Sequence, residues 1–311
     1  MSKSLVLNFH NVQDGVLFEK IILALKSRYQ IVSLQQLNEM LVQGKAPKNI
    51  CHISFDDGES SFYHVIFPVL KKHKVPVSLF VSADIIVNRK NFWFQEVKDY
   101  DDGVMKKLVI KKFQLPATAI EKFSFREIFK NLTINNIEAL IADYQAQTKC
   151  NPTEPMNMTL SELLEADASG LVTVGAHTLR HPILKNEDDQ SSFTEITASI
   201  KMLQQILGHP VKYFAYPNGR PGIDFGDREQ QYLMDNNIDL AFSTELDHLS
   251  PFVDLLRVPR MGFPRMGLSP ANPLIYFRLF LGKRWIDIKS ITKPSEKKLR
   301  KQVALVFNHK P

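Results

Sequence analysis

Apolar, strand-like segments that end in polar and reactive residues recur along this 311-residue chain. The segment Ile-Ser-Phe-Asp-Asp-Gly at 53–58 is the most informative, because it places two adjacent carboxylates, Asp56 and Asp57, at the end of an apolar strand. An apolar-periodic helix is expected around 60–73, and Val-Pro-Val-Ser-Leu-Phe-Val at 75–81 predicts the next buried strand. The pattern indicates a βαβ unit whose acids lie at the carboxyl end of a strand, where barrel active sites lie.

Two histidines follow a later segment of the same kind. Leu-Val-Thr-Val at 171–174 leads into Gly-Ala-His-Thr-Leu-Arg-His at 175–181, which contains His177 and His181. One carboxylate and two imidazoles are a common ligand set for a divalent hydrolytic metal, and they leave positions open for water and substrate. A second carboxylate nearby can accept a proton from the water. Neighbouring strand residues point to opposite faces, but a turn at Gly58 lets both carboxylates reach one pocket.

Each motif alone has a simple structural interpretation. Asp-Asp-Gly commonly forms a turn, and a His-x-x-x-His pair is frequent on helices. Here both motifs follow apolar strands, and Phe-Ala-Tyr-Pro-Asn-Gly at 214–219 follows another. The combination favours an active site over unrelated coincidences.

In this order, the motifs resemble those of the polysaccharide deacetylases, the carbohydrate esterases of family 4 with a NodB-homology domain. The similarity extends over roughly 4–87 and 165–265. It implies a distorted α/β barrel and the metal-dependent removal of an N-acetyl group from an amino sugar in a polysaccharide or glycan precursor. It also implies that Asp56 is the catalytic base. The metal, which we expect to be zinc, would bind to Asp57, His177 and His181.

The catalytic acid has two candidates. The triplet Leu-Asp-His at 246–248 matches the late Leu-x-His motif of the family, but it lies in a polar loop. The opening segment at 4–12 is an apolar strand that ends at His10, and it resembles the first strand of the circularly permuted poly-N-acetylglucosamine deacetylases, which contains the acid histidine. The segment at 29–37 matches the same subgroup. We therefore expect His10, and not His248, to be the acid.

The family's third motif usually contains an arginine that is missing here. The strand-like segment at 255–263 offers Arg257 instead, with Arg260 as the alternate if the register is shifted by one turn of the loop. A cation hydrogen-bonded to Asp56 would keep this carboxylate ionised and oriented. An ordinary salt bridge at the end of the barrel is the other role open to Arg257.

Four further residues are candidates for substrate contact. Tyr216, Pro217 and Asn218 follow a predicted strand, and the backbone N–H after Tyr216 and Pro217 is expected to stabilise the oxyanion. Trp93 lies in a mostly helical insertion expected at about 88–165, between the two metal motifs. Its ring could stack on a sugar, or it could anchor the insertion to the barrel.

Length and composition fit one barrel with additions. With 44% apolar residues, the chain can bury a complete α/β-barrel core. We predict a deacetylase barrel over 1–270 and a basic, aromatic extension over 271–311. Residues 276–311 contain 10 Lys and Arg against 2 Asp and Glu, a surplus larger than the net charge of +6 for the whole chain. The stretch 273–285 is aromatic and apolar and then basic, which predicts contact with an anionic membrane surface; a solvated tail with a buried aromatic latch is the alternative.

The remaining features concern location and partners. No motif supports nucleic acid as a partner. No run of ~18 or more apolar residues could span a bilayer, and the first residues show no signal-like apolar core. Cys51 and Cys150 are expected to be reduced, with a single disulfide as the alternative. We expect a cytoplasmic protein, peripheral at the inner face of the membrane, that acts on a nucleotide-linked, lipid-linked or intracellular glycan.

Two rival functions remain open at this point. A carbon–nitrogen hydrolase for a small amide could use the same barrel, and a degenerate esterase could bind a glycan without turning it over. The second rival is disfavoured, because binding alone requires no base beside a metal.

Overall fold

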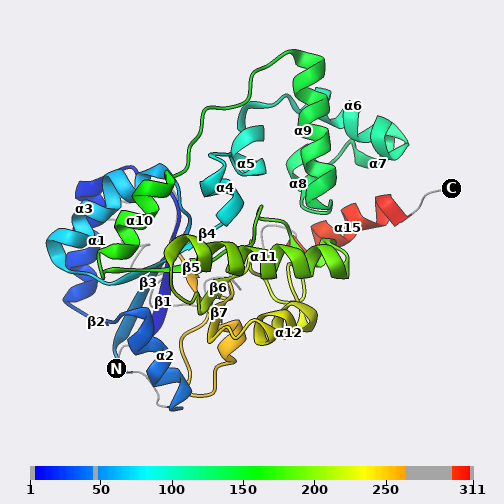
Figure 1. Ribbon diagram of the computed structural model, residues 1–311. Helices are drawn as coiled ribbons and strands as arrows, with labels where there is room; N and C mark the ends of the chain where they lie inside the picture. Colours follow the sequence, from blue (N-terminus) through cyan, green and yellow to red (C-terminus); the bar gives the residue numbers. More distant parts are fainter. Residues whose placement is uncertain (1–3, 45–47, 264–295, 309–311) are drawn as a thin grey trace.

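A parallel β-sheet forms the centre of the computed structural model, which describes residues 4–44, 48–263 and 296–308 (Figure 1). The strands are β1 (Leu5–Phe9), β2 (Gln30–Ile31), β3 (Ile50–Asp57), β4 (Val77–Val81), β5 (Val172–Ala176), β6 (Tyr213–Ala215), β7 (Leu240–Phe242) and β8 (Met261–Gly262). Their order in the sheet is β7-β6-β5-β4-β3-β1-β8, and β2 pairs with β3. The first strand of the chain therefore lies between β3 and the last strand.

The two edges of the sheet approach each other at the segment that leads into β8. Val258 forms a parallel bridge with Phe242 at the end of β7, and Met261 of β8 pairs with Leu7 of β1. The sheet is thus curled into a distorted α/β barrel, and the predicted fold class is confirmed.

Helices that connect the strands cover the outer face of the sheet. They are α1 (Gly15–Lys26), the π-helix η1 (Phe62–Ile66) with α3 (Phe67–His73), α10 (Leu160–Ala168), α11 (Asp189–Leu207) and α12 (Asp227–Asp235). The helix α2 (Leu34–Val42) instead contributes Leu34, Leu37 and Leu41 to the apolar cluster that contains the inward-facing side chains of the strands. Local signals fix several ends: Ser33 and Gln36 form a capping box at the start of α2, and Gly208 ends α11 with a left-handed φ of 74°.

Side chains on the strands alternate between the helices and the barrel interior. On β1, Leu5, Leu7 and Phe9 join the main hydrophobic core together with the covering helices. Val6 belongs to a second apolar cluster inside the barrel, and Asn8 points the same way. The inward face therefore becomes polar toward the carboxyl end of the strand.

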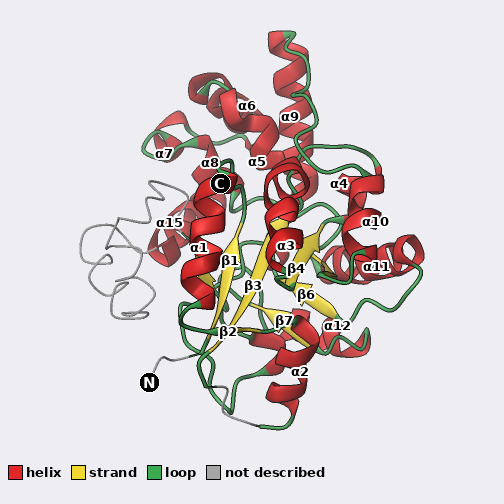
Figure 2. Ribbon diagram, turned by 90° about the vertical axis from the view of Figure 1, so that its left-hand side faces the viewer, coloured by secondary structure: helices red, strands yellow, loops and turns green. Residues whose placement is uncertain are grey.

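Between β4 and β5 the chain forms a set of helices at one end of the barrel (Figure 2). They are α4 (Ala83–Val87), α5 (Trp93–Glu96), the 3-10 turn η2 (Val97–Asp99), α6 (Asp102–Phe113), α7 (Ala117–Ile120), α8 (Phe125–Phe129) and α9 (Ile134–Thr148). They enclose a hydrophobic core of their own. Val303 of the C-terminal helix α15 (Glu296–Asn308) is buried in this core, so α15 packs against the insertion. The predicted domain boundaries remain predictions.

Three further expectations concern the membrane and the cysteines. The stretch 273–285, predicted to contact a membrane, lies outside the described residues. Among the helices that the structure describes, none has the length and apolar character needed to cross a membrane. Cys51 is buried in β3 and Cys150 follows α9, and both are free thiols.

Candidate metal and catalytic site

Asp57, His177 and His181 come together at the carboxyl ends of β3 and β5. Oδ1 of Asp57 lies 3.7 Å from Nε2 of His177 and 3.7 Å from Nε2 of His181. The three ligand atoms lie within 4.8 Å of one another, and all three side chains are buried. Bonds of about 2.1 Å to a tetrahedral ion would separate two ligands by roughly 3.4 Å, so these residues fit a divalent metal.

The backbone at the end of β3 explains how two adjacent carboxylates reach one pocket. Asp57 has a φ of 75° and Gly58 a φ of 73°, both in the left-handed region. Asp56 keeps the inward direction of the strand, and the turn redirects Asp57 to the same side. Glycine is required at position 58, since a Cβ there would also lie 2.9 Å from Cγ1 of Val81.

The loop from His177 to His181 is not helical, and a buried glutamate fixes it. Thr178 and His181 have left-handed φ values of 65° and 62°. The carboxylate of Glu195 on α11 accepts hydrogen bonds from the main-chain N–H groups of the two residues before His181 and from Nε of Arg180. The two imidazoles therefore converge from an irregular loop that α11 holds in place.

Both imidazoles are held in the neutral form that binds metals. Burial lowers the pKa of His177, and burial together with neighbouring His177 lowers the pKa of His181 well below its usual value. Nδ1 of His177 donates to the carbonyl of Ala215 at 2.7 Å. Nε2 of His177 therefore keeps its lone pair for a ligand.

Asp56 is ionised and held by donors from two distant segments. Arg260 donates from Nη1 and Nη2 to the two carboxylate oxygens at 2.7 and 2.9 Å, and Nδ2 of Asn8 donates to Oδ2 at 2.8 Å. Burial alone would raise the pKa of Asp56. The positive charge and hydrogen bonds of Arg260, with a contribution from His10, outweigh burial and hold this pKa well below its usual range. Nε2 of His10 lies 3.8 Å from Oδ2.

Arg257, expected beside Asp56, lies elsewhere, and that expectation is wrong. The Arg257 guanidinium donates two hydrogen bonds to Glu245, at 2.6 and 2.7 Å, near the surface. The alternate, Arg260, is fully buried beside Asp56. The 3-10 turn η4 (Leu255–Arg257) ends before the chain enters the barrel, which leaves Arg257 outside.

A pocket of about 460 Å³ joins the metal ligands, Asp56 and His10. This volume lies within the ~300–1,000 Å³ typical of small-molecule sites. Leu246 lines the pocket, whereas His248 is not among the described residues that line it. The position of His10 is therefore the one that suits an acid.

The loop after β6 forms one wall of this pocket. Tyr216 stacks on Phe225 with ring centroids 3.5 Å apart, and its hydroxyl donates to the carbonyl of Leu256 at 3.0 Å. Tyr216 and Asn218 line the pocket, and Pro217 lies between them. Their contact with substrate stays a prediction.

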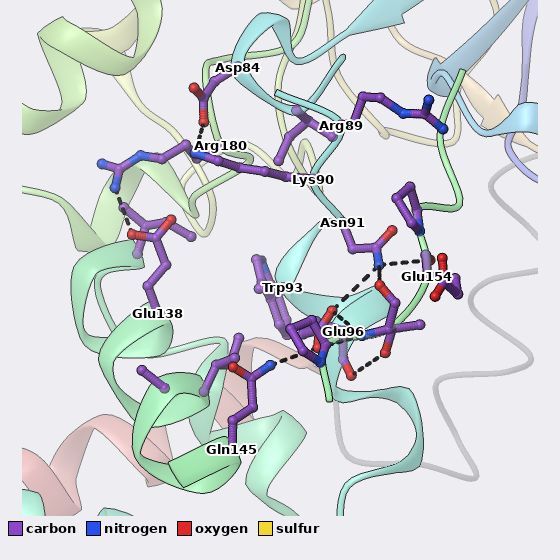
Figure 3. Close-up of a pocket in the computed structure, with 17 residues that line it drawn as sticks. Asp84, Arg89, Lys90, Asn91, Trp93, Glu96, Glu138, Gln145, Glu154 and Arg180 are labelled. Atoms are coloured by element: carbon purple, nitrogen blue, oxygen red, sulfur yellow. Dashed lines mark hydrogen bonds and ion pairs between the residues drawn. The ribbon is translucent and has the colours of Figure 1, made fainter. Parts of the chain in front are cut away.

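Trp93 lines the pocket from the insertion, but its ring is only 8% exposed. Its Nε1 donates to the carbonyl of His181 at 3.3 Å, and its ring packs against Phe129 in the insertion core. Figure 3 shows a second pocket, of about 570 Å³, with Trp93 on one wall and the Arg180 to Glu138 ion pair on another. The burial of Trp93 and its contact with Phe129 favour the anchoring role over stacking on a sugar.

Two residues of the site, Asn8 and Glu195, were not predicted from the sequence. Asn8 on β1 lies two residues before His10, so strand alternation could have placed both side chains on one face. Glu195 lies inside the 19-residue helix α11, and no local pattern distinguishes it from a surface glutamate.

Comparisons with known proteins agree with this geometry. The family model for polysaccharide deacetylases matches residues 43–120 and 124–235, more than half of the chain. The chain therefore belongs to the polysaccharide deacetylase family, enzymes that hydrolyse N-acetyl amide bonds. A comparison with curated proteins gave no match.

Several solved structures share the fold. The Streptococcus pyogenes deacetylase PplD in complex with acetate is 18% identical, with a TM-score of 0.58 over 89% of this chain and 98% of that one. IcaB from Ammonifex degensii is 20% identical, with a TM-score of 0.59 over 85% and 93%. A de-N-acetylase from Aggregatibacter actinomycetemcomitans is 18% identical, with a TM-score of 0.55 over 84% and 94%. At these identities the likeness concerns the fold.

Proposed function

We propose that this protein is a metal-dependent hydrolase that removes the N-acetyl group from an amino sugar in a glycan or glycan precursor. The observation that carries the proposal is the convergence, in one pocket, of three buried metal ligands and a separate ionised carboxylate, Asp56. Asp57, His177 and His181 would hold the ion, and this ligand set suits zinc. When bound, the ion would polarise the acetyl carbonyl and acidify the attacking water.

Asp56 is the base in this scheme. A carboxylate offers about four acceptor positions, and Arg260 and Asn8 occupy three of them. One position remains for the proton of the attacking water. The low pKa of Asp56 keeps its carboxylate ionised and therefore able to accept a proton.

His10 is the acid that protonates the leaving amine. Its side chain is 28% exposed and lies near Asp56, so it can reach both the pocket and the solvent that restores its proton. It follows β1, which lies between β3 and β8. This placement of the first strand supports membership of the circularly permuted subgroup.

The loop after β6 would stabilise the developing oxyanion. Asn218 and Gly219 have left-handed φ values of 57° and 72°, which turn the backbone sharply beside the pocket. The N–H of Asn218, directly after Tyr216 and Pro217, is the candidate donor.

Acetate release from a panel of N-acetylated amino sugars and their oligomers tests this function. We expect release from at least one compound, loss after treatment with a chelator, and recovery with zinc. A parallel panel of small amides tests the rival carbon–nitrogen hydrolase. Turnover of a small amide without any turnover of an amino sugar would contradict the proposal. The cytoplasmic location at the inner face of the membrane also stays a prediction, which cell fractionation can test.

A further inference from the structure

An ion-pair cluster forms one side of the catalytic pocket, and the deacetylation scheme does not use it. Three of its side chains line the pocket: Lys130 at the end of α8, Arg220 in the loop after β6, and Glu296 at the start of α15. Oε1 of Glu296 accepts from Nζ of Lys130 at 3.1 Å, and Oε2 lies 2.6 Å from Nη1 of Arg220. Three segments that are far apart in sequence therefore meet beside the catalytic residues.

A second ion pair behind the cluster fixes its backbone. Arg300, one turn after Glu296 on α15, pairs with the buried Asp224 at 2.7 Å. Arg300 also donates to the main-chain carbonyl of Lys130 at 3.1 Å, and Asp224 accepts from the main-chain N–H of Arg220 at 2.9 Å. These bonds position the two pocket-lining cations before any ligand binds.

The charges of the cluster do not cancel at the pocket. Arg300 pairs with Asp224 and also donates to Oε1 of Glu296 at 3.2 Å, so the carboxylate of Glu296 is shared by Lys130, Arg220 and Arg300. The cluster thus has three cations and two carboxylates. Within the described part of the chain, one positive charge is left over on this wall. Lys130 and Arg220 are 35% and 46% exposed, and their three and five N–H donors exceed what one carboxylate can accept.

We propose that Lys130 and Arg220 bind a phosphate group attached to the acetylated amino sugar. A lysine and an arginine with spare donors are the side chains that most often recognise phosphate, through charge-assisted hydrogen bonds. The cations and the metal ligands line the same pocket of about 460 Å³, so a sugar phosphate can contact both. The inference rests on the proposed deacetylase function, and it makes the substrate a phosphate-linked precursor and not a neutral polymer. Glu296 is then a positioning residue that separates the two cations and weakens their attraction for the phosphate.

The test compares kcat/KM for acetate release from three derivatives of N-acetylglucosamine. One is the neutral methyl glycoside, one an alkyl phosphodiester, and one a nucleoside diphosphate sugar, so that the last two distinguish a lipid-type from a nucleotide-type phosphate. We expect the wild type to prefer at least one phosphate compound by about tenfold, since one hydrogen bond to a charged group contributes roughly a factor of ten or more in affinity. The double variant Lys130→Gln/Arg220→Gln should lose this preference.

Three further variants separate binding from folding. Lys130→Arg should retain the preference, and Glu296→Gln should increase it because a competing negative charge is removed. Lys107→Gln on α6, an exposed lysine away from the pocket, is the matched control and should behave like the wild type. Calorimetric titration of the slow His10→Ala protein with the phosphate compounds gives a readout independent of turnover. The Kd of the phosphate compounds for the His10→Ala protein should rise about tenfold when Lys130→Gln and Arg220→Gln are added.

The outcomes distinguish this inference from the function on which it rests. If the wild type releases no acetate from any amino sugar, the deacetylase proposal fails. If it deacetylates the neutral and phosphate compounds equally well, or if the double variant keeps the preference, the phosphate assignment is overturned and the deacetylase function stands. A preference for an amino sugar with a carboxylate over both phosphate compounds also overturns it.

Discussion

Asp56 and Asp57 are adjacent in the sequence, yet they belong to two halves of the pocket that are built differently. The metal half consists of Asp57, His177 and His181. The base half consists of Asp56, Asn8, His10 and Arg260. In the metal half, turns and a short loop at strand ends place each ligand. In the base half, the donors to Asp56 come from segments 48 and 204 residues away.

This difference predicts separable failures. Damage to the metal half should remove the ion and with it all activity. Damage to the base half should leave the ion in place and change the rate or the stability of the fold. The following experiments test whether the two halves fail independently.

The largest effect is expected from a change in the metal half. His177→Ala removes a buried ligand whose Nε2 lies 3.7 Å from Asp57, and two ligands alone hold a divalent ion weakly. We expect the dialysed variant to lack metal by elemental analysis and to release no acetate. A variant that keeps full metal occupancy would show that the ion binds elsewhere.

Asp56→Asn should have the next largest effect and should leave the metal in place. The substitution deletes the base, so kcat should fall by about 10⁴-fold, the upper end of the range for one proton-transfer group. Metal content and acetate release measured on the same sample check both parts of the expectation. Loss of the ion instead would mean that the two carboxylates have exchanged roles.

The metal half is easier to predict from the sequence than the base half. Its ligands lie at strand ends, whereas the donors to Asp56 come from distant segments. The meeting of the Asp56–Asp57 pair with His177 followed from strand patterns, since the carboxyl ends of parallel strands meet at one end of a barrel. The barrel itself and the role of Asp57 as metal ligand were implied by the resemblance to the deacetylases. The choice between Arg257 and Arg260 depends on the turn η4, which has no distinctive local signal. Glu296 reaches the pocket only because α15 packs against the insertion through Val303, a tertiary contact that local patterns do not contain.

Arg260→Met tests the base half through stability. It removes the partner of a buried charge, which typically costs about 3–5 kcal/mol because Asp56 is left uncompensated. Urea unfolding should detect this loss. Arg257→Gln is the matched control: its ion pair with Glu245 is partly exposed, so a change of only about 0–1 kcal/mol is expected. Equal losses in the two variants would place the buried ion pair in doubt.

His10→Ala tests the acid and should lower kcat by about 10²–10³-fold, less than the loss of Asp56. The smaller effect is expected because the pocket is open at His10, so water can partly replace the acid. The His248→Ala variant should retain nearly the wild-type rate. The opposite result, a large loss of rate in His248→Ala and almost none in His10→Ala, would identify His248 as the acid. It would also contradict the assignment of this chain to the circularly permuted subgroup.

The smallest effect concerns His52, which lies on the inward face of β3 four residues before Asp56. Its Nδ1 donates to the carbonyl of Val32 at 2.9 Å, and Nε2 lies 2.9 Å from Oγ of Ser78. Burial lowers the pKa of His52 from 6.5 to about 4. The unfolded chain therefore takes up a proton that the folded chain does not, and stability is lost as the pH falls from 6.5 toward 4. This difference corresponds to about 3 kcal/mol.

His52→Gln isolates this contribution, because glutamine keeps hydrogen-bonding capacity but does not titrate. The free energy of unfolding in urea, measured at several pH values between 7.5 and 4.5, should fall less steeply for the variant than for the wild type. All other titrating groups, including those of both halves of the site, are common to the two proteins and cancel in the difference. Parallel pH profiles would mean that folded His52 accepts its proton near the ordinary pKa. The polar interior below Asp56 would then be open to water, and the ion pair of Asp56 with Arg260 would be partly solvated instead of buried.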